Sequence, residues 1–432
     1  MAEIKPLRAW RYHPKYTPVI DTLTSPLFDV VSKKQREALY QNPVNSIHLS
    51  VPLGENPAKN AVDLLEKWKK DHIIQQDELP AIYVYYQFFR LAGSDKEYCR
   101  KGFICHIKAY DWNENILLRH ENTIPAAVND RIKLLEETLL NSSATHGLYA
   151  DPDFELEAFM DESMRDPIYE TEDYQGARDV LAIIQDMAVI QRFIRVLKDK
   201  QVLLADGHHR YEGSLEYRKK MMANNPNHTG QEAYNFHLMY LTNSEADDLR
   251  ILPTHRLLEK LTVPKEEFLN RLQEYFTVTP KEDPYELNEV IAGKPWAFGM
   301  YIDGQAYKIR LLPEKHALID WETTAEVKEL DLTVLHYFVF GKVLGIEAEA
   351  QRNYPGLSYV RNFTECIAKV DAHAAEAAFI TNEVSMEQVK QVCQSGAVMP
   401  QKSTFFYPKV ICGFLFSSIK PEEFASELDP CF

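Results

Sequence analysis

The chain has few cysteines for its length, and none of them forms a close pair. Six occur in 432 residues, at Cys99, Cys105, Cys366, Cys393, Cys412 and Cys431, and no C-x-x-C motif is present. This spacing fits neither a zinc site nor the disulfide framework of a small secreted domain. We therefore expect reduced thiols and a cytoplasmic protein.

Long apolar runs and a surplus of positive charge are also missing. No stretch approaches the roughly 20 apolar residues that span a bilayer, and the N-terminus MAEIKPLRAWRYHPKYTP has no apolar segment after its basic residues. The formal net charge is -16, whereas proteins that bind nucleic acid backbones carry an excess of Lys and Arg. We expect neither a membrane nor a nucleic acid as partner, which leaves a small anion in a local basic pocket.

Strand-like and helix-like segments alternate along most of the chain, which is typical of an α/β protein with mixed sheets. A length of 432 residues allows two or three domains. A turn-rich, acidic stretch at 141–176 is the expected boundary region. We predict an N-terminal α/β region at 1–145, a core at 146–250 and a C-terminal α/β region at 251–432.

The clearest local pattern is a strand–helix–strand–helix unit that begins at Val180. VLAII (180–184) reads as a buried strand, DMAVIQRFIRVLKDK (186–200) as an amphipathic helix capped by Asp186, and QVLLA (201–205) as a second strand. The Asp206-Gly207 turn follows, and a helix restarts at once with His208, His209 and Arg210.

A helix start of this composition suits an anion. The first backbone N–H groups of a helix have no partner within the helix, and the helix dipole adds partial positive charge. Arg210 offers a fork for phosphate, and Asp206 is either the N-cap or a ligand for the magnesium ion that accompanies nucleotide phosphates. His208 and His209 lie about 100° apart around the helix, so one can face the anion while the other packs or relays a proton. In the simpler alternative Asp206 only caps the helix, Gly207 only makes a turn, and the histidines are surface groups.

Two further polar segments are candidates for the same chemistry. In RHENT (119–123), His120 and Glu121 follow a strand, and because adjacent strand residues point to opposite faces at most one of them enters a site. Glu121 is either an acid–base group or an ordinary surface carboxylate. His255 follows Pro253 in a segment compatible with a helix start, which is also compatible with a capped helix bearing solvated charges.

The segment QKSTFFYPK gathers small polar and basic residues near the C-terminus. Lys402, Ser403 and Thr404, with Lys409 a few residues later, can hold a phosphate or carboxylate, although no G-x-x-x-x-G-K precedes them. They are a candidate phosphate-binding cluster.

The segment LLADGHHRYEGSLEY (203–217) resembles the Asp-Gly-His-His-Arg signature of the free serine kinases, and is more loosely similar to the helix-start motifs of sulfiredoxin and ParB proteins. The resemblance implies a ParB/sulfiredoxin-like nucleotide-binding core within a larger chain. The wider sequence resembles a prokaryotic domain-of-unknown-function family, number 1015. The matching segments are SPLFDVVS (25–32), NPVNSIHLSVP (42–52), RHENT (119–123), DRIKLLEET (130–138), LPTHRLL (252–258), DLTVLHYFVF (331–340) and MPQKSTFFYPK (399–409).

The kinase resemblance implies phosphoryl transfer to or from a small hydroxylated metabolite, with serine and O-phosphoserine as first candidates, and ATP or ADP with Mg²⁺ as cofactors. The kinases' catalytic glutamate lies upstream of their motif; Glu121 is our choice here and Glu37 the second. The alternative is a ParB-like nucleotide-binding regulatory module without turnover. The predicted site comprises Asp206, His208, His209 and Glu121 as catalytic residues, Gly207, Arg210, His255, Lys402, Ser403 and Thr404 around phosphate or nucleotide, and Asp206 as metal ligand.

Overall fold

The computed structural model describes residues 2–424, which form two compact units. Unit 1 contains residues 2–119, 123–249 and 408–424, and unit 2 contains 120–122 and 250–407. The chain therefore passes between the units four times. Within 2–424, no helix is both long and apolar enough to cross a membrane. Cys431 lies outside the described residues.

Unit 1 is built on a mixed sheet. Nine strands of the described chain join it in the order β6-β11-β8-β12-β5-β4-β10-β9, with β1 paired to β5. The pairs β11–β6 and β12–β8 are parallel and the others antiparallel. The strands are β1 (Ile4–Lys5), β4 (Ile82–Arg90), β5 (Glu97–Lys108), β6 (Leu117–Arg119), β8 (Thr145–Tyr149), β9 (Tyr169–Glu172), β10 (Arg178–Ile184), β11 (Val202–Asp206) and β12 (Phe236–Asn243). The predicted α/β class with mixed sheets is confirmed.

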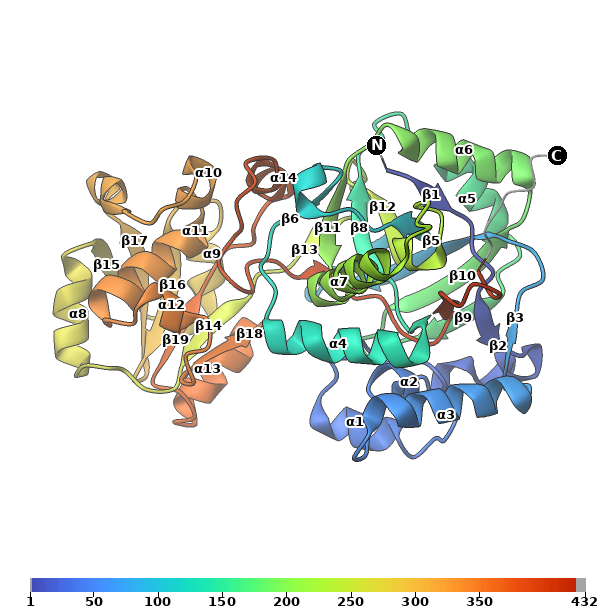
Figure 1. Ribbon diagram of the computed structural model, residues 1–432. Helices are drawn as coiled ribbons and strands as arrows, with labels where there is room; N and C mark the ends of the chain where they lie inside the picture. Colours follow the sequence, from blue (N-terminus) through green and yellow to red (C-terminus); the bar gives the residue numbers. More distant parts are fainter. Residues whose placement is uncertain (1, 425–432) are drawn as a thin grey trace. The chain divides into compact units, whose positions relative to one another are not determined.

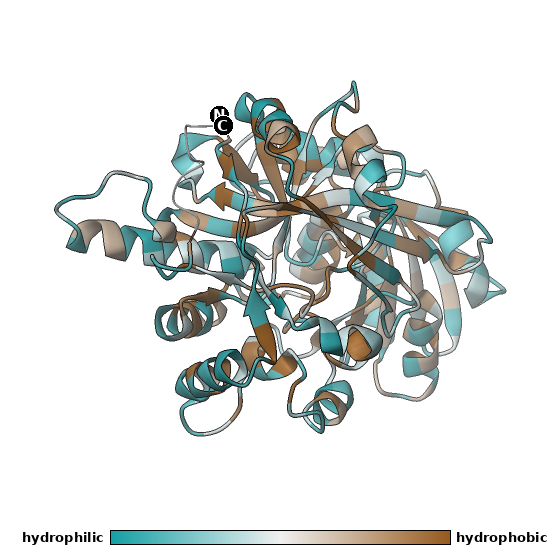
Figure 2. Cartoon of the chain, turned by 90° about the vertical axis from the view of Figure 1, so that its right-hand side faces the viewer, coloured by the Kyte–Doolittle hydropathy of each residue, from teal (hydrophilic) through white to brown (hydrophobic). Residues whose placement is uncertain are grey.

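Both faces of this sheet are covered, which explains why β4 is apolar along almost its whole length. Ile82, Val84 and Tyr86 belong to one core with residues of α6, whereas Tyr83 and Tyr85 belong to a second core with residues of α3. In Figure 2 hydrophobic residues concentrate along the central strands. The helices of unit 1 are α1 (Lys33–Leu39), α2 (Ile47–Ser50), α3 (Pro57–Lys70), α4 (Pro125–Thr138), α5 (Glu157–Ser163), α6 (Met187–Lys198) and α7 (His208–Asn224) (Figure 1).

The predicted strand–helix–strand–helix unit is confirmed as β10, α6, β11 and α7. The Asp186 side chain caps α6 by accepting from the backbone N–H groups of Ala188 and Val189. β10 and β11 are not neighbours, because β4, β5, β12 and β8 lie between them in the sheet. Two small antiparallel pairs complete the unit, β2 (Trp10–Tyr12) with β3 (Ile74–Gln76) and β7 (Leu140–Asn141) with β21 (Ser417–Ser418).

Unit 2 has its own sheet, in the order β15-β17-β16-β19-β14-β18. The strands are β14 (His255–Leu258), β15 (Phe276–Lys281), β16 (Ala297–Ile302), β17 (Gln305–Leu311), β18 (Leu357–Val360) and β19 (Ala377–Ile380), with β13 (Arg250–Ile251) and β20 (Phe406–Tyr407) as a separate pair. Its α-helices are α8 (Lys265–Gln273), α9 (Leu287–Ile291), α10 (Ala325–Lys328), α11 (Asp331–Val334), α12 (Ala348–Gln351), α13 (Phe363–Asp371) and α14 (Met386–Gln394). A π-helix at Leu335–Val343 continues α11. Asp303 and Gly304 turn the β16–β17 hairpin with positive φ at both positions, which Asp-Gly pairs favour.

Two expectations differ from the structure. The helix start expected at His255 is wrong: β14 begins there, and pairing on both sides with β18 and β19 decides for a strand. The three predicted regions also differ from the observed division, because strands on both sides of residue 145 share the sheet of unit 1 and the last segment of the chain returns to that unit.

A row of buried polar side chains crosses the middle of the unit 1 sheet. The Asp179 carboxylate on β10 accepts from the Tyr85 hydroxyl at 2.5 Å and from the Gln87 amide at 2.8 Å. Gln87 also donates to the Lys409 carbonyl at 3.0 Å. Its amide oxygen accepts from Arg100, which in turn donates to the Pro408 carbonyl. The sheet thereby holds the chain segment at 408–409 in place.

Gly102 lies in β5 where β12 approaches closely. A Cβ at this position would lie 2.6 Å from both Thr242 Cγ2 and Tyr240 Cε2, with the Leu241 carbonyl closer still. We expect Gly102→Ala to lower the free energy of unfolding by about 1–3 kcal/mol, the usual cost of overpacking, in denaturant titrations. Gly341→Ala is the control, because the nearest atom to its Cβ is 3.5 Å away. Equal stability of the two variants would contradict the close approach.

Asp179 makes the stability of the fold depend on pH. Burial raises the pKa of this carboxyl to about 7, although the hydrogen bond from Tyr85 acts in the opposite direction. A raised folded-state pKa means that stability is highest below the ordinary pKa, near 4, and falls as the pH rises through the folded value. Asn mimics the neutral carboxyl. Relative to Asp179→Asn, the wild type should lose on the order of 4 kcal/mol of unfolding free energy between about pH 4 and 8. Asp199→Asn, at an exposed carboxylate, should follow the wild type; parallel curves for Asp179→Asn and wild type would refute this assignment.

Candidate functional site

The start of α7 has the predicted strand–turn–helix geometry. β11 ends at Asp206, Gly207 is the N-cap with φ of 90°, and the 17-residue helix begins at His208. Among the described residues no side chain caps the helix, so Asp206 is not its N-cap, which removes one of the two alternatives for this residue. A Cβ on Gly207 would lie 2.6 Å from Thr145 Cγ2 and 2.8 Å from Arg210 Nη2, so conformation and space both require glycine here.

The Asp206 carboxylate lies between two cations. Oδ1 pairs with Lys409 Nζ, and Oδ2 accepts from Arg210 Nη2 at 3.1 Å. Burial alone would raise the pKa of Asp206, but the charges of Lys409 and Arg210 outweigh it and hold the pKa below its ordinary value. Asp206 is therefore ionised at neutral pH.

Arg210 is held in one orientation by the protein. Its Nη1 donates to Ser143 Oγ at 3.0 Å and to the Ala144 carbonyl at 2.6 Å, while Nη2 contacts Asp206. Only Nε is buried without a partner within residues 2–424. Arg210 thus ties the turn before β8 to the end of β11, and its role as a phosphate fork stays a prediction.

Positive charge exceeds negative charge around Asp206. Arg100 and Arg210 are 3% and 8% exposed, and the Lys409 side chain is 13% exposed. Asp206 is the carboxylate that pairs with Lys409 and Arg210, and the pKa of Asp179 near 7 leaves that second carboxyl partly neutral. Arg100 has two nitrogens, Nε and Nη1, without a partner in the described part of the chain. A cluster of buried cations with incomplete compensation favours an anionic ligand.

His146 lies within this cluster and carries no charge. It is opposite Asp206 in the β8–β11 pairing, and its Nε2 lies 2.8 Å from Thr242 Oγ1. Burial, and then the charge of Arg100, lowers the pKa of His146 well below its ordinary value. A neutral ring near Arg100 and Lys409 avoids adding a third positive charge.

The two histidines of the motif have different surroundings, as their spacing predicts. His209 is half-buried, and its Nε2 accepts from the backbone N–H of Ile124 at 3.0 Å, which places the ring hydrogen on Nδ1. His208 is 5% exposed. The catalytic roles of both stay predictions.

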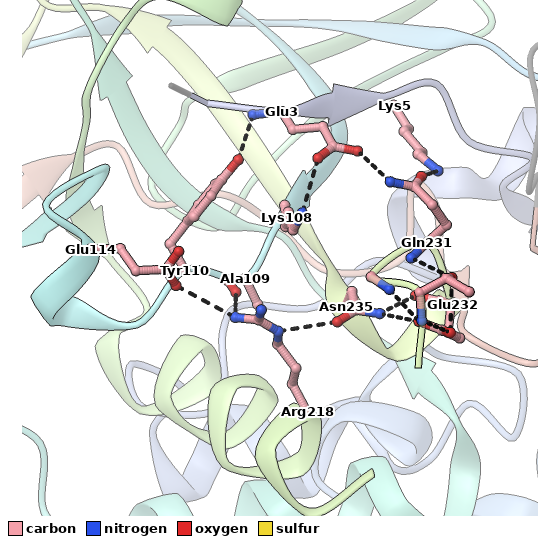
Figure 3. A network of polar contacts seen from close by, with 12 residues as sticks. Glu3, Lys5, Lys108, Ala109, Tyr110, Glu114, Arg218, Gln231, Glu232 and Asn235 are labelled. Atoms are coloured by element: carbon pink, nitrogen blue, oxygen red, sulfur yellow. Dashed lines mark hydrogen bonds and ion pairs between the residues drawn. The ribbon is translucent and has the colours of Figure 1, made fainter. Parts of the chain in front are cut away.

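The rest of α7 is anchored at several points, which orients its first turn. Gly213 allows close packing on α4, since its Cβ would lie 3.3 Å from Arg131 Cβ. The Tyr211 hydroxyl donates to the Tyr110 carbonyl at 2.8 Å. Figure 3 shows Arg218, further along the helix, reaching Asn235 and the Ala109 carbonyl.

The other predicted site residues belong to unit 2. His255 is buried in β14, where Nδ1 accepts from the Thr381 N–H at 3.2 Å, and burial lowers its pKa to about 4. Ser403 donates to the Pro400 carbonyl at 2.5 Å, and Thr404 Oγ1 lies 2.7 Å from His120 Nε2. Lys402 is exposed with φ of 57°.

Glu121 lies in the same unit, and its charge raises the pKa of Tyr359 in addition to the larger effect of burial. The predicted roles of Glu121, His255 and Lys402–Thr404 are not tested by these contacts and stay predictions. Glu37 is exposed on α1 in unit 1.

The donor set at Asp206 does not fit a magnesium ion. Both carboxylate oxygens are engaged by Lys409 and Arg210. Across residues 2–424, no group of three or more His, Cys, Asp or Glu side chains is arranged to hold a metal. Lys409 and Arg210, not a metal ion, neutralise the charge of the Asp206 carboxylate.

Sequence reasoning missed the partners of Asp206. Lys409 was considered only together with Lys402, Ser403 and Thr404, yet it belongs to unit 1, more than 200 residues from its carboxylate. Arg100 lies in β5, which also carries Glu97, Lys101, His106 and Lys108. No local pattern therefore distinguishes Arg100 as the buried charge.

Comparison with known proteins gives several similarities. A search of curated proteins finds no match. Among solved structures, the chain is similar to a free serine kinase in complex with AMP, at 14% identity and a TM-score of 0.38 over 74% of this chain and 92% of the kinase. It is also similar to a conserved hypothetical protein from Pyrococcus furiosus (13%, 0.37, 73% and 95%) and to C-terminally truncated SbnI from Staphylococcus aureus (11%, 0.37, 73% and 87%).

The family resemblance seen in the sequence is confirmed over most of the chain. The family model described as "Protein of unknown function (DUF1015)" matches residues 4–333, and the chain belongs to this family.

Proposed function

We propose that the first turn of α7 binds a phosphate group, and that the chain transfers phosphoryl groups between a nucleotide and a small hydroxylated metabolite. Serine and O-phosphoserine are the first candidates, on the resemblance of the Asp206–Arg210 motif to the free serine kinases. The observation that carries the proposal is the cluster of Arg100, Arg210 and Lys409 beside a helix start that no side chain caps.

Arg210 and Lys409 have different parts in this proposal. Arg210 is fixed by Ser143, Ala144 and Asp206, so it orients the carboxylate and adds positive potential. Lys409 has its ammonium on a flexible stem and can exchange Asp206 for a phosphate oxygen. Phosphoryl transfer depends mainly on positioning and charge neutralisation, and these residues supply both.

The transfer also needs a group that accepts the hydroxyl proton of the metabolite. His209 uses Nε2 as acceptor for the Ile124 N–H. We therefore assign the acceptor role to His208, the neighbouring ring at the helix start. Asp206 is assigned to hold Lys409 and Arg210 in position.

A regulatory module that binds a nucleotide without turnover is the second candidate. The engagement of both Asp206 oxygens by protein cations favours it, because a carboxylate held in this way is not available to a metal ion or to a proton. The ParB-like core implied by the motif is compatible with either function.

Lys409→Met tests the phosphate site. We expect the affinity for AMP or ADP, measured by calorimetry, to fall at least ~10-fold, because a charge-assisted hydrogen bond contributes about 1.5–3 kcal/mol. Lys198→Met, at an exposed lysine of α6, is the matched control and should bind as the wild type does. Lys409→Met leaves Asp206 paired with Arg210, and its unfolding midpoint, measured beside the titration, separates a loss of folding from a loss of binding. Wild-type affinity in Lys409→Met would refute the site.

Turnover distinguishes the two candidate functions. Purified protein is incubated with Mg²⁺, ATP or ADP, and serine or O-phosphoserine, and phosphate transfer is followed by ³¹P NMR. Asp206→Asn should lower turnover at least ~10²-fold while nucleotide binding stays equal or becomes tighter, because the variant removes negative charge from the site.

Losing one partner of a buried ion pair costs about 3–5 kcal/mol, so folding of Asp206→Asn is checked by its unfolding midpoint. His208→Gln provides a second test that leaves the ion pairs in place, and it should also lose at least ~10²-fold in turnover. Asp199→Asn is the control for both. Nucleotide bound but never consumed by the wild type, across the whole panel, would exclude transfer and leave the regulatory module.

A further inference from the structure

Unit 2 contains a pocket that has no part in the proposed function. It has a volume of about 590 Å³. Its lining includes Trp321, His336, Arg352, Tyr359 and Gln401, together with the carboxylates of Glu322 and Glu349. A pocket of this size accommodates a small metabolite.

A buried arginine, Arg256, lies behind the pocket wall and forms no ion pair with the residues that the structure describes. Arg256 on β14 is fully buried, and its guanidinium contacts His336 Nε2 at 3.3 Å, the Gln401 carbonyl at 3.2 Å and the ring of Tyr359 at 5.3 Å to the centroid. Within residues 2–424 no carboxylate lies within ion-pair distance of it. Burial lowers the pKa of Arg256 to about 10, yet it is charged at neutral pH. Three residues that line the pocket thus surround an uncompensated positive charge.

The neighbouring histidine does not compensate this charge. Burial, and then the charge of Arg256, lowers the pKa of His336 to about 3, so its ring is neutral. Its Nδ1 donates to Gln351 Oε1 at 2.9 Å, and its Nε2 accepts from Arg256. The ring is therefore fixed in one neutral tautomer and adds no charge to the pocket lining.

The lining also carries hydrogen-bonding groups that the described residues leave unsatisfied. The Tyr359 hydroxyl and Gln401 Oε1 are both shielded from solvent and have no partner within residues 2–424. Arg352, at the end of α12, is exposed and forms no ion pair in the same part of the chain. Leaving a buried polar atom unsatisfied costs about 1–3 kcal/mol, and a ligand with matching groups would remove that cost.

We propose that this pocket binds a small organic anion, a carboxylate or phosphate monoester, that also carries a hydroxyl or ammonium group. Arg352 and the Tyr359 hydroxyl bind the anionic group, and the field of Arg256 favours it from behind the wall. Gln401 Oε1 accepts from the hydroxyl or ammonium group. The start of α7 belongs to the other unit.

The test is calorimetric titration of the full chain with L-lactate, L-alanine, propionate and glycerol 3-phosphate. Propionate shares the carboxylate of the first two compounds but lacks their donor group. If the pocket prefers a carboxylate, L-lactate or L-alanine should bind at least ~10-fold more tightly than propionate. If it prefers a phosphate monoester, glycerol 3-phosphate should bind and the carboxylates should not. Absence of binding by all four compounds, or equal binding of propionate and the best carboxylate ligand, overturns the proposal.

Variants assign the binding to this pocket. Arg352→Ala should weaken binding at least ~10-fold, whereas Arg310→Ala, at an exposed arginine of β17, should leave it unchanged. Tyr359→Phe should weaken binding several-fold without lowering the unfolding midpoint, because its hydroxyl has no partner within residues 2–424. A merely structural hydroxyl would lower the midpoint. Binding that survives Arg352→Ala, or that disappears in Lys409→Met, belongs elsewhere and also overturns the proposal.

Discussion

The ion pairs of Asp206 join three segments that are distant in sequence. Arg210 connects the carboxylate to the turn at 143–144, and Lys409 brings in the last segment of the chain after its excursion through unit 2. The arrangement works only if Gly207 turns the chain with positive φ, because a Cβ there would collide with Thr145 and Arg210. A buried charge must be matched closely, since removing one partner costs several kcal/mol. The end of β11, the start of α7 and the 408–409 segment are therefore constrained together.

Each unit holds a buried arginine that forms no ion pair within residues 2–424. In unit 1, Arg100 also keeps two nitrogens unsatisfied in this part of the chain. In unit 2, the guanidinium of Arg256 is hydrogen-bonded, but no carboxylate of the described residues pairs with it. A protein with a net charge of -16 repels anions at long range, so binding of anions requires such local concentrations of positive charge. Both proposed sites follow from this one electrostatic pattern, although their ligands and residues differ.

The sheet of unit 1 supports the site by burying polar groups as well as apolar ones. Tyr85, Asp179, Gln87 and Arg100 form a connected row that ends on the carbonyls of 408 and 409. A row of this kind is costly when incomplete and rigid when satisfied. It sets the position of Lys409 from the backbone side, while Asp206 sets it from the side chain.

Local sequence determined much of the secondary structure near the site. The apolar strand, the Asp-Gly turn and the following helix at 202–224 are specified by hydrophobic period and turn chemistry, and the Asp186 cap of α6 and the Asp303-Gly304 hairpin follow the same local rules. Tertiary structure decided the strand pairing and the ion pairs, which these local rules do not specify. His255 begins a strand because β18 and β19 pair with β14 on its two sides. Asp206 is an ion-pair partner rather than a cap because Lys409 and Arg210 reach it. Pairing across some 200 residues leaves no periodic trace in the sequence, so only the folded chain reveals which charges meet.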